Sequence, residues 1–177
     1  MAGWRLVRLV ECEVNNDEVI AAKPWTASRT ITTQLVFPEH ANALGKAFGG
    51  QIMAWSDMCG GICSMRHSGG NTVTASIDDL HFQHPVAIGD TVIVEARVNA
   101  TFTTSLEVEV TVVGENPVTG QRWPCVEARM TFVAIDAQAK PRPVPPLLLD
   151  TDDARGRHAA ANARREERLA RRRAGRT

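Results

Sequence analysis

Residues 38–57, PEHANALGKAFGGQIMAWSD, contain an asparagine, a pair of glycines and an aspartate that could together act on a carbonyl group. Gly49 and Gly50 stand where a helix is expected to begin, and the first turn of a helix has unpaired N–H groups and a partial positive charge. Because glycine has no side chain, a substrate carbonyl could approach the Gly50 N–H closely enough to be polarised. Asp57 follows about 10 Å further along the helix axis, where its carboxylate could act as a base or as a nucleophile.

Both polar residues also have a structural interpretation. A carboxylate near a helix N-terminus is stabilised by the helix dipole without any catalytic role, and an asparagine such as Asn42 commonly forms turns. Trp55 and Met58 flank Asp57, however, and an ionised carboxylate is penalised in apolar surroundings unless something compensates it. The residues alone therefore leave catalytic and structural roles open for Asp57 and for Asn42.

A long helix is expected to position these residues. Residues 50–67 show helical periodicity, with one mostly apolar face and a smaller, more polar face. The apolar face comprises Ile52, Trp55, Cys59, Ile62, Cys63 and Arg66, and the polar face comprises Met53, Asp57, Gly60, Ser64 and His67. Gly60 and Gly61, inside the helix, each cost about 1 kcal/mol relative to alanine, which predicts a close approach by another backbone.

Strands are expected before and after this helix. Alternation of apolar and polar residues predicts strands at 29–37, 72–82, 91–100, 104–113 and 121–135, with a bulge near Asp78 and Asp79 and one more short strand at Trp4–Val10. One helix followed by a run of hairpin-linked strands indicates an α+β fold, in which an antiparallel sheet packs on the helix. Residues 151–174 are charged and rich in alanine, and we expect them to form a terminal helix.

The formal net charge of zero conceals an asymmetry along the chain. Nine arginines and four acids give residues 151–177 a charge of +5, and residues 1–150 carry −5. A basic tail could bind nucleic acid, but no aromatic residues stand among the arginines to stack on bases. We therefore expect a tail that packs on its own domain or on a neighbouring one, and no nucleic-acid partner.

Other sequence features narrow the class of protein. The four cysteines form no CxxC pair and lack the matching histidines of a zinc site, so we expect free thiols in a reducing compartment and no metal. No apolar run approaches the length of a membrane span, and the first residues make a poor signal peptide, which favours a cytoplasmic location. Neither a P-loop nor a G-x-G-x-x-G motif occurs.

Several segments in order resemble the hot-dog-fold acyl-CoA thioesterases, specifically the cytosolic long-chain acyl-CoA hydrolases and their bacterial single-domain relatives. They are HANALGKAFGGQIMAWSDMCGG, TVTASIDDLHFQHPVAIGD, TSLEVEV, TFVAID and KPRPVPPL. The resemblance implies a sheet wrapped around the central helix, and a hydrolase that releases free fatty acid and coenzyme A without a cofactor. It suggests an N-terminal extension at 1–28, a thioesterase domain at 29–148 and an Arg-rich helical tail at 149–177. It also implies a homodimer, commonly assembled into a trimer of dimers.

The same resemblance suggests which residues form the site. Asp57 of one subunit would be the base or the nucleophile. Asn42 of the other subunit would orient the water or the thioester, and the Gly50 N–H would polarise the thioester carbonyl. The coenzyme would contact Gly49, Val73, Thr74, Ser76, Thr104 and Ser105, with Arg66, Lys140 and Arg142 as phosphate partners. Phe102 departs from the family pattern, because many bacterial relatives have a glycine shortly before the Thr-Ser pair.

Two other functions remain open at this point. His81 and His84 could suggest a hot-dog dehydratase, but the proline-rich loop of those enzymes is absent. A non-enzymatic acyl-CoA sensor or regulator is the alternative from a different class, although such a protein would typically lack Asp57 and carry a DNA-binding module. The sequence does not specify the acyl chain length, the oligomer beyond a dimer, nucleotide regulation, or the roles of residues 1–28 and of the tail.

Overall fold

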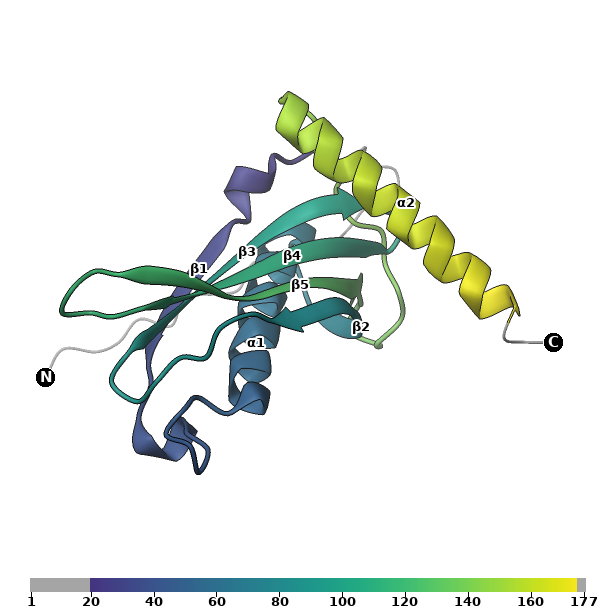
Figure 1. The fold of residues 1–177 in the computed structure, drawn as a ribbon. Coiled ribbons are helices and arrows are strands. Elements are labelled where there is room, and N and C mark those ends of the chain that lie inside the picture. The colour runs from purple at the N-terminus through teal and green to yellow at the C-terminus, as the bar shows by residue number, and fades with distance from the viewer. Residues whose placement is uncertain (1–19, 175–177) are drawn as a thin grey trace, which may run out of the picture.

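Five antiparallel strands form one sheet that curves around a central helix in the described part of the chain (Figure 1). The computed structural model describes residues 20–174, so the strand predicted at Trp4–Val10 lies outside the described residues. The strands are β1 (Thr30–Leu35), β2 (Thr72–Phe82), β3 (Thr91–Thr101), β4 (Ser105–Glu115) and β5 (Arg122–Ala134), and the helices are α1 (Gly49–Ser68) and α2 (Asp152–Ala174). Short 3-10 turns, η1 (Trp25–Ala27) and η2 (Pro38–His40), flank β1. The expected α+β arrangement, an antiparallel sheet wrapped around a long helix, is confirmed.

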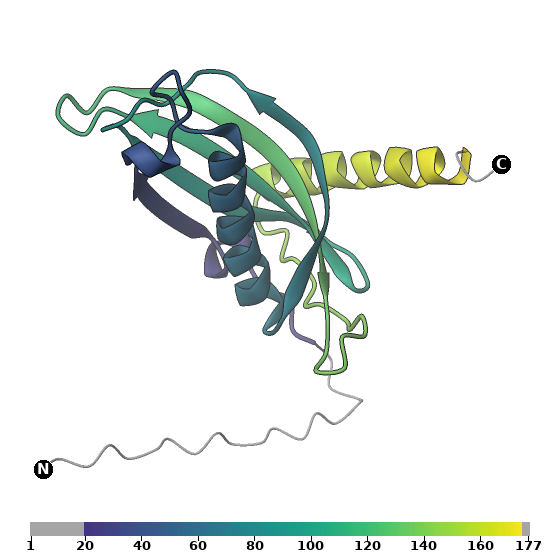
Figure 2. The same ribbon diagram turned by 90° about the horizontal axis from the view of Figure 1, so that it is seen from below.

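The sheet has the strand order β1-β3-β4-β5-β2, so β1 and β2 are its edges. Period-2 alternation places the apolar residues of the central strands on the inner face, where they pack against α1 (Figure 2). Buried residues on this face include Val94, Val108, Val110, Met130 and Phe132. The outer face carries polar residues in register, such as Arg97, Glu109 and Arg129 on β3, β4 and β5.

α1 is buried more extensively than its sequence pattern predicts. Ile52, Trp55, Cys59 and Cys63 are buried as expected, but Gly60, Ser64 and His67 of the expected polar face are buried too, and Arg66 of the expected apolar face is exposed. The predicted faces are therefore wrong in part, because the curved sheet covers the helix over a wide angle. The buried polar groups have partners: Ser64 Oγ lies 2.5 Å from Thr72 Oγ1.

His67 is the largest of these buried polar groups. Its Nδ1 lies 3.1 Å from Ser28 Oγ and its Nε2 lies 3.3 Å from the Pro145 carbonyl oxygen, so it ties the end of α1 to two other segments. Burial lowers the pKa of His67, although the hydrogen bond to Pro145 acts in the opposite direction. We conclude that His67 joins the three segments as a neutral imidazole.

The glycines inside α1 make room for a side chain rather than for a backbone. A Cβ at Gly60 would lie 3.1 Å from the Phe132 ring and 3.4 Å from the Met130 sulfur, whereas a Cβ at Gly61 would lie 3.9 Å from the same ring. The predicted close approach is real at Gly60, but it comes from an aromatic side chain of β5. α1 then ends at Ser68 and is capped by Gly69, whose φ of 73° is left-handed.

β2 is an irregular edge strand. Its pairing with β5 shifts register twice, once between Thr74 and Ser76 and once between Asp78 and His81. The second shift confirms the bulge predicted near Asp78 and Asp79. Three residues, Ser76 to Asp78, keep regular pairing between the two shifts.

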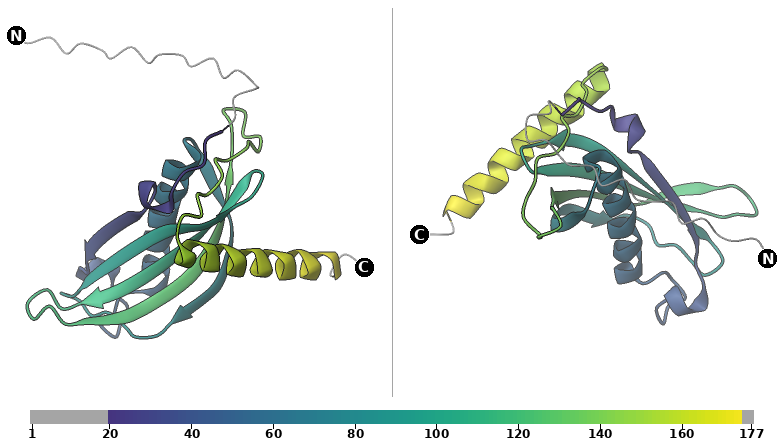
Figure 3. Two further views of the ribbon diagram at one scale, coloured as in Figure 1. Left: turned by 90° about the horizontal axis from the view of Figure 1, so that it is seen from above. Right: turned by 180° about the vertical axis from the view of Figure 1, so that it is seen from behind.

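α2 crosses the outer face of the sheet, on the side opposite α1 (Figure 3). Its own residues Ala154 and Ala161 are buried, Arg164 bonds Glu107 of β4 at 2.6 Å, and Arg168 bonds Asp78 of β2 at 2.7 Å. The predicted terminal helix is confirmed, and these ion pairs join it to its own domain. Within residues 20–174 no helix is both long and apolar enough to cross a membrane.

Candidate active site

Asp57 lies on α1 beside the edge strand β2. Its half-buried carboxylate accepts a hydrogen bond from Thr74, with 2.6 Å between Thr74 Oγ1 and Asp57 Oδ1. Thr72 and Thr74 both point toward the helix, because residues two apart on a strand share a face, and Thr72 contacts Ser64 two turns further along α1. The strand that follows the helix thus supplies one donor to the candidate carboxylate.

The start of α1 offers a backbone donor. Phe48 caps the helix, and its carbonyl oxygen accepts the N–H groups of Gln51 at 2.9 Å and Ile52 at 3.2 Å. Among the residues that the structure describes, the Gly50 N–H has no acceptor. This is the free donor that the sequence predicts at the Gly-Gly pair.

Two exposed aromatic rings lie against the glycine pair. A Cβ at Gly50 would lie 2.6 Å from the Phe48 ring, and a Cβ at Gly49 would lie 3.2 Å from the Phe82 ring. Both rings are about half exposed or more, at 60% and 49% of their surface. They form an apolar wall beside the helix N-terminus that sequence reasoning missed, although Phe48 directly precedes the glycines and could have been noticed.

Asn42 forms the turn that its residue type predicts. Its Oδ1 accepts the backbone N–H groups of Leu44 at 2.9 Å and Lys46 at 3.3 Å. The side-chain NH₂ group has no acceptor within residues 20–174, and no contact joins Asn42 to Asp57 of the same protomer. Asn42 is exposed, so its amide donors are available to a group from outside the protomer.

The expected coenzyme contacts on β2 and β4 lie at one end of the sheet, whereas Gly49 lies against Phe82 at the other end of β2. Ser105 of β4 is in register with Val133 of β5, which is in register with Val73 of β2, so two strand spacings, about 10 Å, separate Ser105 from Val73. Ser76 lies just past the first register shift, and Thr104 precedes β4. Phe102, the departure from the family pattern, is covered by Arg165 of α2, whose guanidinium carbon lies 4.4 Å from the ring centroid.

The expected phosphate-binding residues lie toward the same end of the sheet, because the Arg142 N–H bonds the Ala134 carbonyl and the Ala134 N–H bonds the Thr104 carbonyl. Arg66 donates to the Arg29 carbonyl and to Thr30 Oγ1, and Arg142 donates to the carbonyls of Ser68 and Ile135. Both therefore support the backbone near the C-terminal end of α1, about 24 Å along the axis from Gly50. Lys140 is exposed in the turn after β5. The structure does not bring these three residues to the helix N-terminus.

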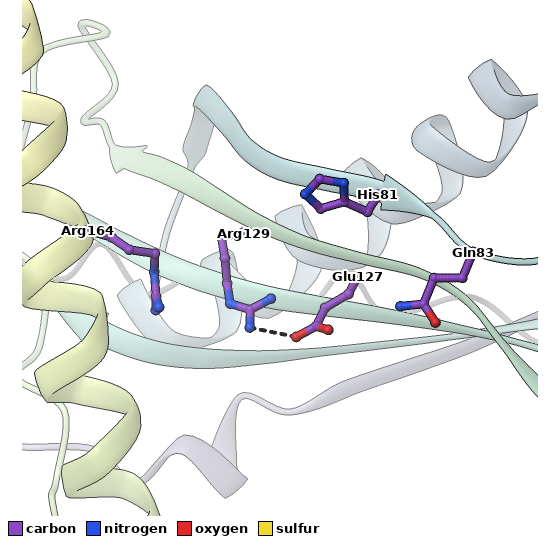
Figure 4. A pocket seen from close by; sticks show the side chains of 5 residues that line it. All are labelled: His81, Gln83, Glu127, Arg129 and Arg164. Atoms are coloured by element: carbon purple, nitrogen blue, oxygen red, sulfur yellow. Dashed lines mark hydrogen bonds and ion pairs between the residues drawn. The ribbon is translucent and has the colours of Figure 1, made fainter.

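A polar pocket lies on the outer face, lined by His81, Gln83, Glu127, Arg129 and Arg164 (Figure 4). Arg129 bonds Glu127 at 2.6 Å, and Arg164 bonds Glu107. Its guanidinium groups are thus already neutralised, and the sheet separates the pocket from Asp57. The Nδ1–H of His84 donates to the Pro124 carbonyl oxygen, 3.0 Å away.

Several ionisable groups outside the candidate site are buried, and burial or ion pairs shift their pKa values. Burial alone would raise the pKa of Glu109, but the guanidinium groups of Arg129 and Arg97 outweigh that effect and lower it. Burial raises the pKa of the Cys63 thiol to about 12 and that of Cys125 to about 11. The described residues include no group of three or more histidine, cysteine, aspartate or glutamate side chains that could hold a metal ion.

Comparison with known proteins points to one superfamily. The sequence pattern of the thioesterase superfamily matches residues 44–121. The chain is 37% identical over 146 residues to YkhA, an uncharacterized acyl-CoA thioester hydrolase of Bacillus subtilis, and the alignment covers 82% of this chain and 85% of that relative.

Solved structures give the same result. An apo hexameric acyl-CoA thioesterase has a TM-score of 0.82 and 39% identity, covering 86% of this chain and 97% of that one. An acyl-CoA hydrolase from Staphylococcus aureus, solved with butyryl coenzyme A and coenzyme A, has a TM-score of 0.80 and 32% identity, covering 88% and 94%. Alanine variants of the Staphylococcus hydrolase have been solved at an asparagine, at an aspartate 15 positions later, and at a threonine 17 positions after that. The chain therefore belongs to the thioesterase superfamily, together with the acyl-CoA thioester hydrolases that it resembles.

Proposed function

We propose that the protein hydrolyses acyl-CoA thioesters to the free acid and coenzyme A, with Asp57, Asn42 and Thr74 as its central polar residues. The observation that carries the proposal is an agreement between the sequence spacings of three residues in the two proteins. Asn42 lies 15 residues before Asp57 and Thr74 lies 17 after it, which are the intervals between the substituted positions of the Staphylococcus hydrolase. The hydrogen bond between Thr74 and Asp57 supports a joint role for two of the three.

The chemistry requires water to add to the thioester carbonyl, the C–S bond to break and the thiol to leave with a proton. Asp57 either takes a proton from the attacking water or attacks the carbonyl itself, forming an anhydride that water then cleaves. The Gly50 N–H donates to the carbonyl oxygen as negative charge develops on it. Phe48 and Phe82 exclude water on one side of the reacting group.

The active form is an oligomer built through β2. An edge strand presents unpaired backbone groups that a second chain can complete, and several apolar side chains on β2 and beside it are exposed. They include Met58, Val73 and Phe82, which are 54%, 46% and 49% exposed in the protomer. Pairing of two copies along β2 would make a dimer in which Asn42 of one copy serves Asp57 of the other. The hexameric relative supports a trimer of such dimers.

The activity is tested by thiol release from a series of acyl-CoA substrates of increasing chain length. Asp57→Asn keeps the shape of the side chain and should abolish most of the turnover, whereas Asp150→Asn, an exposed acid near the tail, should leave it unchanged. Wild-type rates in Asp57→Asn would show that the site is misassigned. Binding of acyl-CoA without any hydrolysis by the wild type would favour the sensor alternative instead, a role that none of the relatives named above carries.

The shared site has its own experiment. Asn42→Ala and Asp57→Ala subunits are each expected to be inactive, and mixing them should restore one intact site in every mixed dimer. Recovery near half of the wild-type activity per mixed dimer supports sites divided between subunits. If mixing restores nothing although mixed dimers form, Asn42 does not act across the interface.

The coenzyme contacts, the cofactor and the location complete the proposal. Val73, Thr74, Ser76, Thr104 and Ser105 contact the coenzyme, while Arg66, Lys140 and Arg142 remain candidate phosphate partners. A thioester carbonyl is electrophilic enough for a carboxylate and a backbone donor, so activity should survive treatment with a chelator. We place the protein in the cytoplasm because Cys59, Cys63 and Cys125 are free thiols, and cell fractionation tests this.

A further inference from the structure

The terminal helix is attached to the sheet by two arginines one turn apart. Arg164 bonds Glu107 on β4 and Arg168 bonds Asp78 on β2, so α2 spans the strand that lies between them. The Arg168–Asp78 pair is well shielded for a pair at a sheet edge, with side chains 17% and 33% exposed. The pair of Arg171 and Glu167 on the same helix is longer and more exposed, with 3.7 Å between the charged atoms and side chains that are 80% and 70% exposed.

The strand held in this way is the one that carries Thr74. Within the protomer β2 bonds only to β5, and each register shift interrupts that ladder. Thr74 borders the first shift of β2 and Asp78 borders the second, with the short regular stretch Ser76–Asp78 between them. The ion pair with Arg168 therefore fixes the far end of the segment whose near end aligns the Thr74 hydroxyl with Asp57.

We propose that Arg168 is a positioning residue for the hydrolytic site: through Asp78 it holds β2 so that Thr74 donates to Asp57. This inference rests on the proposed roles of Asp57 and Thr74. It gives the Arg-rich tail a function within its own protomer, since the Arg168 side chain of α2 reaches β2 from the face opposite α1. Asp78 and Arg168 thereby support the hydrogen bond between Thr74 and Asp57 without contacting either residue of that bond.

The test compares Arg168→Met with the wild type, with Arg168→Lys and with Arg171→Met. Methionine keeps an apolar stem of similar length and removes the charge. We expect kcat to fall about threefold to tenfold with a smaller change in KM, and amide hydrogen exchange in residues 72–82 to accelerate while β3 and β4 are unchanged. Arg168→Lys should restore most of kcat, because the contact uses one nitrogen and one oxygen. Arg171→Met, which breaks the exposed pair, should behave as wild type.

A double-mutant cycle separates positioning from general loss of stability. If Arg168 acts through Thr74, Arg168→Met should have almost no further effect on kcat once Thr74 is valine. Equal loss of kcat in both backgrounds, or wild-type kcat and exchange in Arg168→Met, would overturn the inference and leave the proposed function intact. Full activity of both Asp57→Asn and Thr74→Val would overturn the proposed function itself.

Discussion

Replacing Thr74 by valine probes the surroundings of Asp57 most directly, because valine keeps the branched shape and removes the hydroxyl. In the protomer, Thr74 Oγ1 donates to Asp57 Oδ1 across 2.6 Å. The variant therefore removes one charge-assisted hydrogen bond and little packing. Asp57 then loses the group that fixes the direction of its carboxylate, which is the property that either a base or a nucleophile needs.

The magnitude follows from the type of bond and its exposure. A hydrogen bond to a charged group contributes about 1.5–3 kcal/mol. Thr74 is exposed and Asp57 is half-buried in the protomer, so water competes for the carboxylate and the lower half of that range applies. About 1.5–2 kcal/mol corresponds to a fall in kcat of about 10- to 30-fold.

The assay is steady-state thiol release with butyryl coenzyme A, a ligand of the Staphylococcus relative. Thr72→Val is the matched control, since Thr72 points to the same side of β2 but contacts Ser64 instead of Asp57. It should lower the melting temperature and leave kcat nearly unchanged, and Thr74→Ser should recover most of the activity. Equal kcat values for Thr74→Val and Thr72→Val would refute the argument that the hydroxyl aligns the carboxylate.

Three further outcomes are expected. Gly60→Ala should destabilise the protein by about 1–2 kcal/mol in denaturant melts, because a Cβ would crowd a buried phenylalanine ring, whereas Gly61→Ala has room and should stabilise it by up to about 1 kcal/mol. The thiols of Cys63 and Cys125, with pKa values raised by burial to about 12 and 11, should react with a disulfide reagent at pH 8 only after unfolding. Burial lowers the pKa of His67, so the unfolded state binds more protons below about pH 6.5. The free energy of unfolding should therefore fall as the pH drops through that value, and a His67→Gln variant should lose this dependence.

The strands and the helix were predictable because their signals are local. Alternating residues such as Val92, Val94 and Ala96 define a half-buried strand whatever surrounds it. The faces of α1 were only partly predictable. A helix that packs on a flat surface hides one stripe, but this sheet curves, so it also buries Ser64 and His67 on the stripe that looks polar.

The candidate site also has features that the sequence predicts and features that it does not. The glycine pair and the free Gly50 N–H follow from where a helix starts, which the sequence specifies. The bond from Thr74 to Asp57 depends on how β2 lies across α1, and the ion pair from Arg168 to Asp78 joins residues 90 apart. Tertiary contacts of this kind have no signature in spacing, because many side chains of the same type could form them.

The charge asymmetry of the chain is partly balanced within the protomer. The tail of +5 and the remainder of −5 could be taken as a surface for an external anion. In the fold, Glu107 and Asp78 of the sheet already neutralise Arg164 and Arg168. A charge run on a terminal helix is therefore informative only together with the opposite charges on the face that the helix covers.

Asn42 illustrates why structural and catalytic interpretations of one residue need not compete. Its Oδ1 is used within the turn, where it accepts the N–H groups of Leu44 and Lys46. These two bonds use only the oxygen of the side-chain amide. They also fix the direction of its NH₂ group. A donor held by the backbone loses little conformational entropy when it meets a carbonyl or a water molecule. The turn that sequence reasoning set against catalysis is thus the feature that would prepare Asn42 to serve Asp57 of a second protomer.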